Sequence, residues 1–361
     1  MMGRRFFLLL IIFCSTFCAA QDINFSQNQE IPILRNPSLT GVFNGDIRFI
    51  AGHRNQWLTV PVNYQTTAAS VEFKKPVGYS SYWSIGFQFT NDAAGDGRLG
   101  KSQFLPSFAY HQLISETYNL FLSGGIMGGQ VTQRFDPTGL RFGDQFVDGT
   151  YSASNPTSAS FSNTSINYRD IAVGLSLSGE AGYFNYKYNI GASYFHFNDP
   201  KVAFSGLNDI RLNRKFALNG SIAFMTSDAG DRLLFNGDYL IQGGGRLFQG
   251  GILYRKMLEV EDYDEDNQAI SMGCFYRWDD AIVPLLKYQF ENWTIGLSYD
   301  VNVSKLTRAS RTVGALELTL SYKGFFNIYD ARRSGTDCYV TDAETGQRTN
   351  RVIGYRKRRR Y

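Results

Sequence analysis

The sequence lacks any long apolar run after its first twenty residues. In the rest of the 361-residue chain, no apolar stretch reaches the roughly 18 residues that a membrane-spanning helix needs, which excludes a helical membrane protein. Long amphipathic helical patterns are also missing. Proline is scarce, with 9 residues, whereas the chain has 36 Gly, 22 Tyr and 29 Phe. This mixture is typical of many strands joined by turns.

Cysteine and histidine are equally sparse. Two of the 4 Cys lie in the first twenty residues, and Cys274 and Cys338 alone do not make a disulfide framework. We expect Cys274 to act as a small apolar residue on a lipid-facing surface. A Ser/His/Asn lipase site in a barrel wall would need a histidine beside a serine, and His196 near Ser193 is the nearest candidate. We favour a structural role for it and for the other histidines, His53 and His111.

Positive charge is modest and concentrated at the carboxyl terminus. The net charge is +4, and residues 326–361 hold nine Lys and Arg against four Asp and Glu. The absence of a broad basic face argues against a nucleic-acid partner. The tail has two interpretations. It is either solvated charge or a contact for acidic periplasmic partners or anionic lipid headgroups. The residues of this hypothetical partner contact are Arg356, Lys357, Arg358, Arg359 and Arg360.

Residues 1–20 have the features of a secretory signal peptide. Arg4 and Arg5 precede an apolar core from residue 6 to 13, and small residues follow at Cys18-Ala19-Ala20. We expect cleavage before Gln21. The alternative is a lipoprotein lipidated at Cys18. It is disfavoured because Phe17 occupies a position where such a signal requires a small residue.

Residues 292–322 show the organising pattern of the chain. Every second residue is apolar, first in Trp293, Ile295, Leu297, Tyr299 and Val301, and then in Leu316, Leu318, Leu320 and Tyr322. A period of two indicates strands with one apolar and one polar face. No helices are predicted to cover the apolar face, so lipid must cover it. A sheet in lipid has to close on itself so that no strand edge is left unpaired.

The same alternation recurs along the chain and predicts an all-β protein. We expect a transmembrane antiparallel β-barrel of about fourteen strands, of the outer-membrane type, over residues 46–325. The remaining parts are the signal peptide 1–20, a periplasmic lead-in 21–45 and a basic periplasmic tail 326–361. An even strand number places both ends of the barrel chain in the periplasm. Side chains expected to point inward are Arg48, Gln88, Asn119, Lys187, Asn219, Arg277, Lys287, Asp300 and Glu317.

The alternation stops from Gly128 to Asn167, which predicts a long loop facing outward. A barrel of about fourteen strands encloses more space than one layer of side chains fills. Its lumen is therefore either wet or blocked, and the lead-in 21–45 and the loop 129–167 are the two candidate plugs. Gly243-Gly244-Gly245 is interpreted as a hairpin turn. The acidic run 259–267 lacks the spacing of a calcium loop and is interpreted as a solvated turn.

Several short motifs are similar to the PorP/SprF family of outer-membrane proteins, which is associated with type IX secretion and gliding motility in Bacteroidetes. They span most of residues 21–322. The motifs are Gln21-Asp22, Phe25-Ser26-Gln27, Asn36-Pro37 with Gly41, Arg54-Asn55-Gln56-Trp57, Tyr64-Gln65-Thr66, Ser70-Val71-Glu72, Asp280-Ala281-Ile282-Val283-Pro284, Ser298-Tyr299-Asp300-Val301-Asn302 and Ser304-Lys305-Leu306. The tail departs from the family pattern, because Cys338 is followed by Tyr339 and the basic end is longer.

The resemblance implies a non-enzymatic protein of the bacterial outer membrane without cofactors. It implies two roles: anchoring a periplasmic ring lipoprotein of the type IX machinery, or assisting export and surface attachment of a secreted adhesin. The expected partners are therefore outer-membrane lipid, type IX secretion components and the adhesin. The alternative is an outer-membrane channel for small or lipidic solutes.

Overall fold

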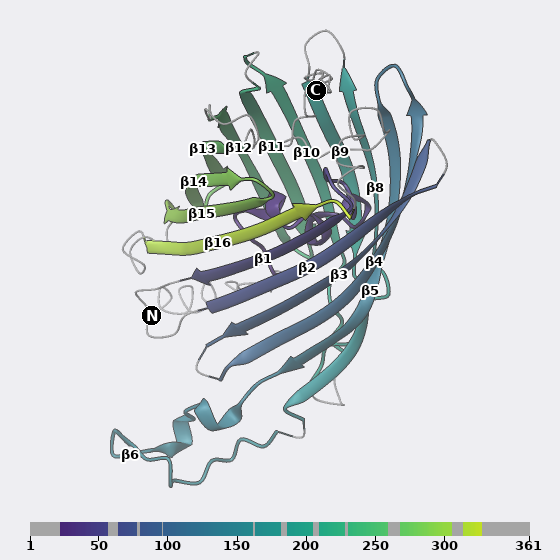
Figure 1. Ribbon diagram of the computed structural model, residues 1–361. Helices are drawn as coiled ribbons and strands as arrows, with labels where there is room; N and C mark the ends of the chain where they lie inside the picture. The colour runs from purple at the N-terminus through teal and green to yellow at the C-terminus, as the bar shows by residue number, and fades with distance from the viewer. Residues whose placement is uncertain are drawn as a thin grey trace, which may run out of the picture.

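Fourteen antiparallel strands close into a barrel in the computed structural model (Figure 1). The structure describes residues 22–56, 64–77, 80–95, 97–161, 163–181, 186–204, 209–227, 230–258, 268–304 and 313–326. Neighbours in the chain are neighbours in the barrel, and β1 pairs with β16 to close it. The strands are β1 (Ile47–Gln56), β2 (Tyr64–Val77), β3 (Ser81–Ala94), β4 (Leu99–Ser115), β5 (Leu120–Arg134), β8 (Ser165–Ala181), β9 (Tyr186–Phe195), β10 (Lys215–Met225), β11 (Arg232–Gln242), β12 (Gly245–Met257), β13 (Ala269–Arg277), β14 (Ala281–Phe290), β15 (Trp293–Asn302) and β16 (Val313–Gly324). The predicted fold class is confirmed.

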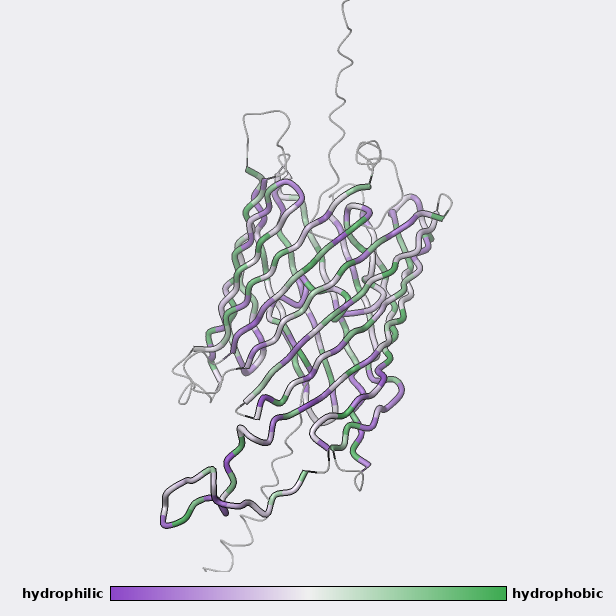
Figure 2. Tube along the Cα trace, turned by 60° about the horizontal axis from the view of Figure 1, so that its bottom comes forward, coloured by the Kyte–Doolittle hydropathy of each residue, from purple (hydrophilic) through white to green (hydrophobic). Residues whose placement is uncertain are grey.

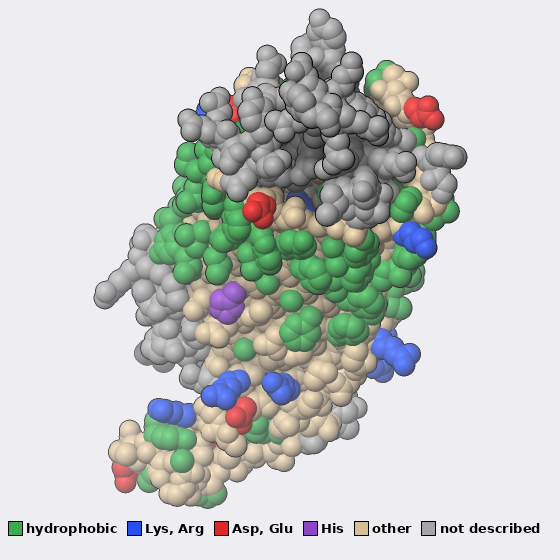
Figure 3. Space-filling view, viewed as in Figure 1, with side chains coloured by type: hydrophobic (Ala, Val, Ile, Leu, Met, Phe, Trp, Pro, Cys, Tyr) green, Lys and Arg blue, Asp and Glu red, His purple; other side chains and the backbone are tan. Residues whose placement is uncertain are grey.

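Alternation along each strand sorts side chains between the outside and the lumen. In β1, Phe49 is exposed while its neighbours Arg48 and Ile50 are buried. Figure 2 shows this switching between hydrophobic and hydrophilic residues along the strands. On the face seen in Figure 3, hydrophobic side chains form a band across the barrel. The band is the surface that acyl chains cover in an outer-membrane barrel.

The two ends of the barrel differ. At one end, here the terminal end, β1 begins and β16 ends, and the amide of Asp46 donates to the carbonyl of Gly324 at 2.7 Å. At the other end, β5 and β8 are joined by residues 135–164, here the arm, which projects from the barrel (Figures 1 and 2). The arm contains the 3-10 helices η3 (Pro137–Gly139) and η4 (Gly143–Gln145) and the short strands β6 (Phe146–Val147) and β7 (Thr150–Tyr151).

The break predicted from Gly128 to Asn167 is too wide. Strand β5 continues to Arg134 and β8 begins at Ser165, with residue-by-residue pairing between them. The outward residues in this stretch are polar, and Thr132 donates to Asn167 across the two strands at 2.6 Å. The hydrogen-bonded pairing of β5 and β8 thus continues beyond the apolar band. There the outward residues are polar, so apolar alternation no longer marks the strands in the sequence. Loop 129–167 is also wrong as a candidate plug, since its arm lies outside the barrel.

Most of the predicted inward residues are buried in the lumen, namely Arg48, Gln88, Lys187, Asn219, Arg277, Lys287, Asp300 and Glu317. Asn119 is the exception. It ends the turn between β4 and β5, where its amide donates to the carbonyl of Glu116 at 3.2 Å. Its φ of 42° is left-handed, a conformation that asparagine tolerates better than most residues. The strand therefore begins after this turn, at Leu120, whereas the sequence pattern predicts a start near Thr117.

Two further sequence predictions can be placed. The turn between β11 and β12 consists of Gly243 and Gly244, and Gln242 pairs with Gly245. Cys274 is a free, exposed cysteine on β13. The signal peptide, the acidic run 259–267 and the basic tail lie outside the described residues. Within the described part of the chain, no helix has the length and apolar character needed to cross a bilayer.

The apolar band predicts a position-dependent cost for charge on the outer surface. Leu175 lies in the band and is 62% exposed, so Leu175→Arg should lower the free energy of unfolding in vesicles by about 2–4 kcal/mol. Asn167→Arg, on the outward side of the same strand but beyond the band, should cost about 0–1 kcal/mol. Denaturant titration in lipid vesicles measures both, and equal costs would contradict the placement of the band.

Candidate functional site: a luminal plug held by buried charges

Residues 22–45, here called the plug, run through the lumen from one end of the barrel to the other. At the terminal end the plug leads directly into β1. At the arm end, the Asp22 carboxylate lies 2.7 Å from Lys101 Nζ and 2.6 Å from Lys215 Nζ. Lys215 is the first residue of β10. The lead-in is therefore the candidate plug that fills the lumen, rather than a segment outside it.

Three short turns make the plug compact, η1 (Asn28–Glu30), α2 (Pro32–Arg35) and η2 (Pro37–Leu39). Proline starts both α2 and η2, where its fixed φ suits the first helical position and its missing N–H is not needed. Between them, the Asn36 side chain accepts a hydrogen bond from the amide of Ser38 at 2.9 Å. Local sequence thus folds the plug into turns that are too short to be independently stable.

Glycines on the barrel wall, which have no side chain, make room for these turns. A Cβ on Gly125 of β5 would meet the backbone of Pro37 at 2.5 Å. A Cβ on Gly174 of β8 would collide with the Asn36 side chain. On the plug itself, Gly41 has a φ of +80° and would press a Cβ against Ser84 of β3. The wall and the plug are therefore fitted to each other at the level of the backbone.

Apolar side chains of the plug form a core inside the barrel. Six are almost fully buried, namely Phe25, Ile31, Ile33, Leu39, Val42 and Phe43. They pack against inward apolar residues of the wall, such as Ile50 beside Phe25 and Ile31. Burying one such side chain stabilises by about 1.5–3 kcal/mol. The whole set amounts to something on the order of 10 kcal/mol, which favours the plug inside the lumen.

A network of buried charges holds the plug near Ser26. Arg54 of β1 pairs with Glu317 of β16 and, at 2.9 Å, with Asp300 of β15. Arg277 of β13 pairs with the same Asp300 carboxylate at 2.7 Å. The Ser26 hydroxyl lies at the centre, because it donates to Asp300 at 2.7 Å and accepts from both guanidinium groups. Glu317, Asp300 and Arg54 are each at most 3% exposed, so they depend on one another for neutralisation.

The wall also binds the main chain of the plug. The two oxygens of Glu317 accept the amides of Ser26 and Gln27 at 2.6 and 2.9 Å. Gln249 of β12 donates to the carbonyl of Ser26 at 2.7 Å. Near the terminal end, Glu72 of β2 accepts the amide of Gly41 at 2.8 Å. These contacts satisfy backbone groups that regular secondary structure would otherwise satisfy.

Further ion pairs secure the middle of the plug. Arg35 pairs with Asp238 of β11 at 2.5 Å, and Glu30 pairs with Lys287 of β14 at 2.6 Å. The Asn36 side chain donates to Asn219 of β10 at 2.9 Å. Together with the contacts at Asp22, Ser26 and Gly41, these pairs tie the plug to strands all around the barrel.

His196 lies at the arm end, just past β9. Its Nδ1 is 2.8 Å from the Asp170 carboxylate, and its Nε2 is 3.6 Å from that of Asp22. Burial opposes protonation, but the hydrogen bond to Asp170 and the negative charge of Asp22 raise the pKa of His196 above the usual histidine value. Ser193 does not contact this imidazole and instead donates to the Arg35 carbonyl at 3.2 Å. The geometry of the lipase alternative is therefore not present at this pair.

The other histidines have separate surroundings. His111 is buried, stacks on Tyr82 with ring centroids 4.1 Å apart, and lies 2.9 Å from the Thr40 carbonyl of the plug. His53 faces outward beside Thr67, at 2.9 Å. No cluster of three or more His, Cys, Asp or Glu side chains in the described part of the chain has the geometry of a metal site.

Removing one charge from the network should destabilise the whole barrel. Glu317→Gln leaves Arg54 short of a partner and weakens acceptance of the Ser26 and Gln27 amides, so we expect a loss of about 3–5 kcal/mol. Glu116→Gln, in the exposed turn between β4 and β5, is the matched control and should change stability by less than about 0.5 kcal/mol. Denaturant titration of the reconstituted proteins compares them. Equal losses of stability in the two variants would show that the charge network does not stabilise the barrel.

A filled lumen should conduct poorly. The intact protein in a planar bilayer is expected to show no large single-channel conductance, because the plug occupies the lumen along its length. A variant with a protease site inserted after Gly45, cleaved after reconstitution and then washed in denaturant short of barrel unfolding, should gain stable open channels. Large channels from the intact protein would contradict a closed lumen.

Comparisons with known proteins come from both sequence and fold. The sequence matches the family described as "Type IX secretion system membrane protein PorP/SprF" over residues 17–322. No curated protein matches it. Solved structures with a similar fold include the toluene transporter TbuX of Ralstonia pickettii, at 12% identity and a TM-score of 0.48, covering 81% of this chain and 92% of that one.

Two other solved structures show comparable likeness. The CymD monoaromatic hydrocarbon channel is 11% identical with a TM-score of 0.45, covering 81% of this chain and 91% of that one. The translocator domain of the autotransporter NalP from Neisseria meningitidis is 11% identical with a TM-score of 0.40, covering 82% and 95%. Likeness at this level says nothing about what this chain binds or transports.

Proposed function

Because the chain belongs to the PorP/SprF family of type IX secretion membrane proteins in the bacterial outer membrane, we propose that it is an accessory of this machinery that acts by protein contact. In this proposal it has no enzymatic activity. It anchors periplasmic ring components or assists export and surface attachment of specific adhesins. The observation that carries the proposal is the plug, which fills the lumen and is tied to strands all around the wall.

The plug favours this role over a channel for small or lipidic solutes. A diffusion channel needs a continuous path, whereas the core around Ile33 joins the plug to inward residues of β4, β5 and β8. At the arm end, Asp22 adds ion pairs to Lys101 and Lys215 on the wall. A barrel closed in this way offers its two ends and its outer surface to partners.

The arm supports a contact role at its end of the barrel, which faces outward if both ends of the barrel chain lie in the periplasm. An aromatic cluster fixes its base, with Phe135 lying 5.1 Å from Phe161 and 4.9 Å from Phe204 between ring centroids. Its tip exposes Phe146 and Val147 on a small hairpin. Across the hairpin, the rings of Phe146 and Tyr151 lie 5.4 Å apart between centroids and give the tip an aromatic face. We propose that the tip contacts the exported adhesin.

Secretion assays in the native host test this function. Replacing Phe146 and Val147 by Ser should leave the barrel in the outer membrane but reduce surface-attached adhesin several-fold, because the apolar contact is lost. Ser160→Ala, at an exposed position of the same arm, is the matched control and should have little effect. Liposome swelling with small solutes should stay at background. Normal adhesin display in a strain without the protein, combined with solute flux through it, would favour the channel.

The tail hypothesis has its own test. Replacing Arg356, Lys357, Arg358, Arg359 and Arg360 by Gln should leave the barrel folded and weaken co-purification of the periplasmic ring lipoprotein at physiological salt, because the charge attraction is removed. Removal of Arg332 and Arg333 is the control for general loss of charge. Unchanged co-purification after the five replacements would reject the tail as a partner contact.

A further inference from the structure

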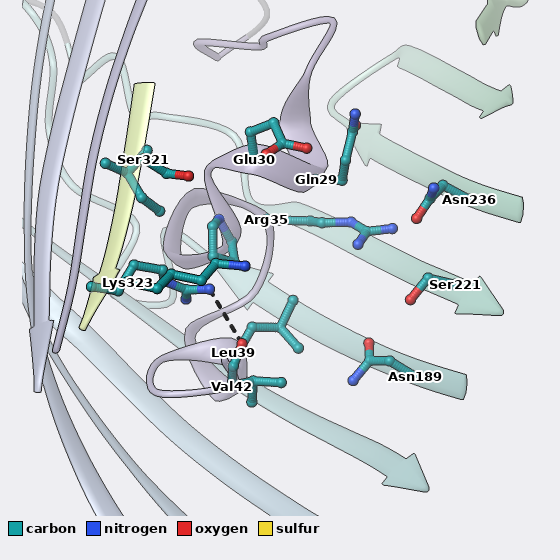
Figure 4. Close-up of a pocket in the computed structure, with 13 residues that line it drawn as sticks. Gln29, Glu30, Arg35, Leu39, Val42, Asn189, Ser221, Asn236, Ser321 and Lys323 are labelled. Carbon is teal, nitrogen blue, oxygen red and sulfur yellow. Dashed lines mark hydrogen bonds between the residues drawn. The ribbon is translucent and has the colours of Figure 1, made fainter. Parts of the chain in front are cut away.

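The barrel wall at β1 and β16 carries a recess on each of its two faces. The inner recess lies in the lumen beside the plug (Figure 4) and encloses only about 80 Å³. Two charged residues that line it are already paired, Glu30 with Lys287 and Arg35 with Asp238. The outer recess, here called the outer groove, has a volume of about 440 Å³. Of the two, the outer groove is the one with room for a ligand larger than a few water molecules.

The outer groove lies in the apolar band, on outward side chains of β15, β16, β1, β2, β3 and β4. The lining residues used below are Ala51, Ala69, Phe87, Phe104, Trp293 and Tyr322. The alanines are directly paired across β1 and β2, and large rings stand on both sides of them. On one side Trp293 lies 4.9 Å from Tyr322, and on the other Phe87 lies 6.2 Å from Phe104, between ring centroids. The two small side chains therefore form the floor of a trough between aromatic walls.

A polar pair lies next to this floor on its arm side. His53 follows Ala51 on the same face of β1 and is exposed. Its Nδ1 lies 2.9 Å from the hydroxyl oxygen of Thr67 on β2. The residue of β16 that pairs with His53 is Leu318, an apolar side chain that is 51% exposed, so the polar pair faces lipid too. Because a polar group in apolar surroundings needs hydrogen-bonding partners, the pair offers a binding group at the end of an apolar groove.

The chemistry of the outer groove fits a single acyl chain. None of the described residues that line it is charged, and the groove is continuous with the surface that acyl chains cover. A methylene group takes up nearly as much space as a water molecule, about 30 Å³, so the groove has room for a chain of roughly fifteen carbons. A polypeptide in the groove would bring N–H and C=O groups that need partners in lipid, and an apolar lining does not supply them.

We propose that the outer groove binds one acyl chain of lipopolysaccharide, the lipid of the outer leaflet. The direction of the groove decides the leaflet, because it runs from Trp293, the first residue of β15 at the terminal end, to His53 on the arm side. With the arm outside the cell, a chain from the outer leaflet brings the ester and hydroxyl oxygens near its carboxyl end to His53. A chain from the inner leaflet would place its methyl end against this imidazole instead.

Lipid that stays bound during purification tests the site. The full chain is extracted from outer membranes in a mild detergent, and the lipids that remain after purification are counted by mass spectrometry. We expect about one lipopolysaccharide per wild-type protein. Ala69→Trp fills the trough from its floor and should lower this retention at least tenfold. The matched control is Ala192→Trp, at an outward alanine of β9 paired with Leu175 and Leu218, and it should retain as much lipid as the wild type.

A second variant separates recognition of a lipid oxygen from general apolar contact. His53→Leu makes the outer face more apolar, so a groove without polar recognition would retain lipid equally well or better. We expect retention to fall at least threefold. Heat-dependent migration in gel electrophoresis shows that each barrel is folded, and Ala51→Trp serves as the filling variant if Ala69→Trp does not fold.

Three results would overturn the proposal. The first is wild-type retention of lipopolysaccharide in a folded filling variant or in His53→Leu. The second is a bound phospholipid in place of lipopolysaccharide, and the third is a second copy of the chain seated on the groove. The secretion role does not enter this experiment, so either proposal can fail without the other.

Discussion

Neutralisation of buried polar groups is the constraint on which this structure depends. Closing the sheet satisfies the strand backbones that face lipid, but it also encloses the charged side chains that alternation points inward. Glu317, Asp300 and Glu72 are almost fully buried and need positive charges and N–H donors around them. Arg54, Arg277 and Arg48 supply the charges, while the plug amides supply donors to Glu317 and Glu72. The barrel and the plug therefore complete each other, and neither has a satisfied interior alone.

This arrangement separates the molecule into parts with different physical tasks. The outward faces of the strands are apolar across the band and polar beyond it, so they set the position in the membrane. The lumen is an interior with an apolar core and fully enclosed ion pairs, similar to that of a water-soluble domain. What remains for partners is the two ends of the barrel, one of which carries the arm, and the outer surface. A protein built in this way suits a role in which contact, rather than passage through an open pore, is the function.

Much of the fold could be predicted from sequence because lipid imposes a strict period of two. Residues 293–301 and 316–322 alternate over the full width of the band, and their strands were placed to within a few residues. Prediction of strands and turns from the sequence failed outside the apolar band, where lipid no longer requires every second residue to be apolar. Residues 128–134 continue β5 beyond the band with glycine and polar residues, and Asn119 belongs to a turn that the strand pattern conceals. The contacts of the plug could not be predicted from the sequence either, because Ser26 binds Asp300 and Glu317, which lie more than 270 residues away in the chain. The motifs Phe25-Ser26-Gln27, Asn36-Pro37, Arg54, Glu72 and Asp300 did carry a signal, because the structure brings them together around the plug.

The placement of the plug in the lumen can be tested most directly by linking it to the wall. The hydroxyl groups of Ser38 in the plug and Ser176 in β8 are 2.9 Å apart, close enough for cysteines at both positions to form a disulfide with little movement. In a chain whose own cysteines are replaced by Ser, Ser38→Cys with Ser176→Cys should oxidise spontaneously in the outer membrane while the barrel stays folded. Two free thiols that both react readily with a bulky maleimide would show that the first segment does not occupy the lumen.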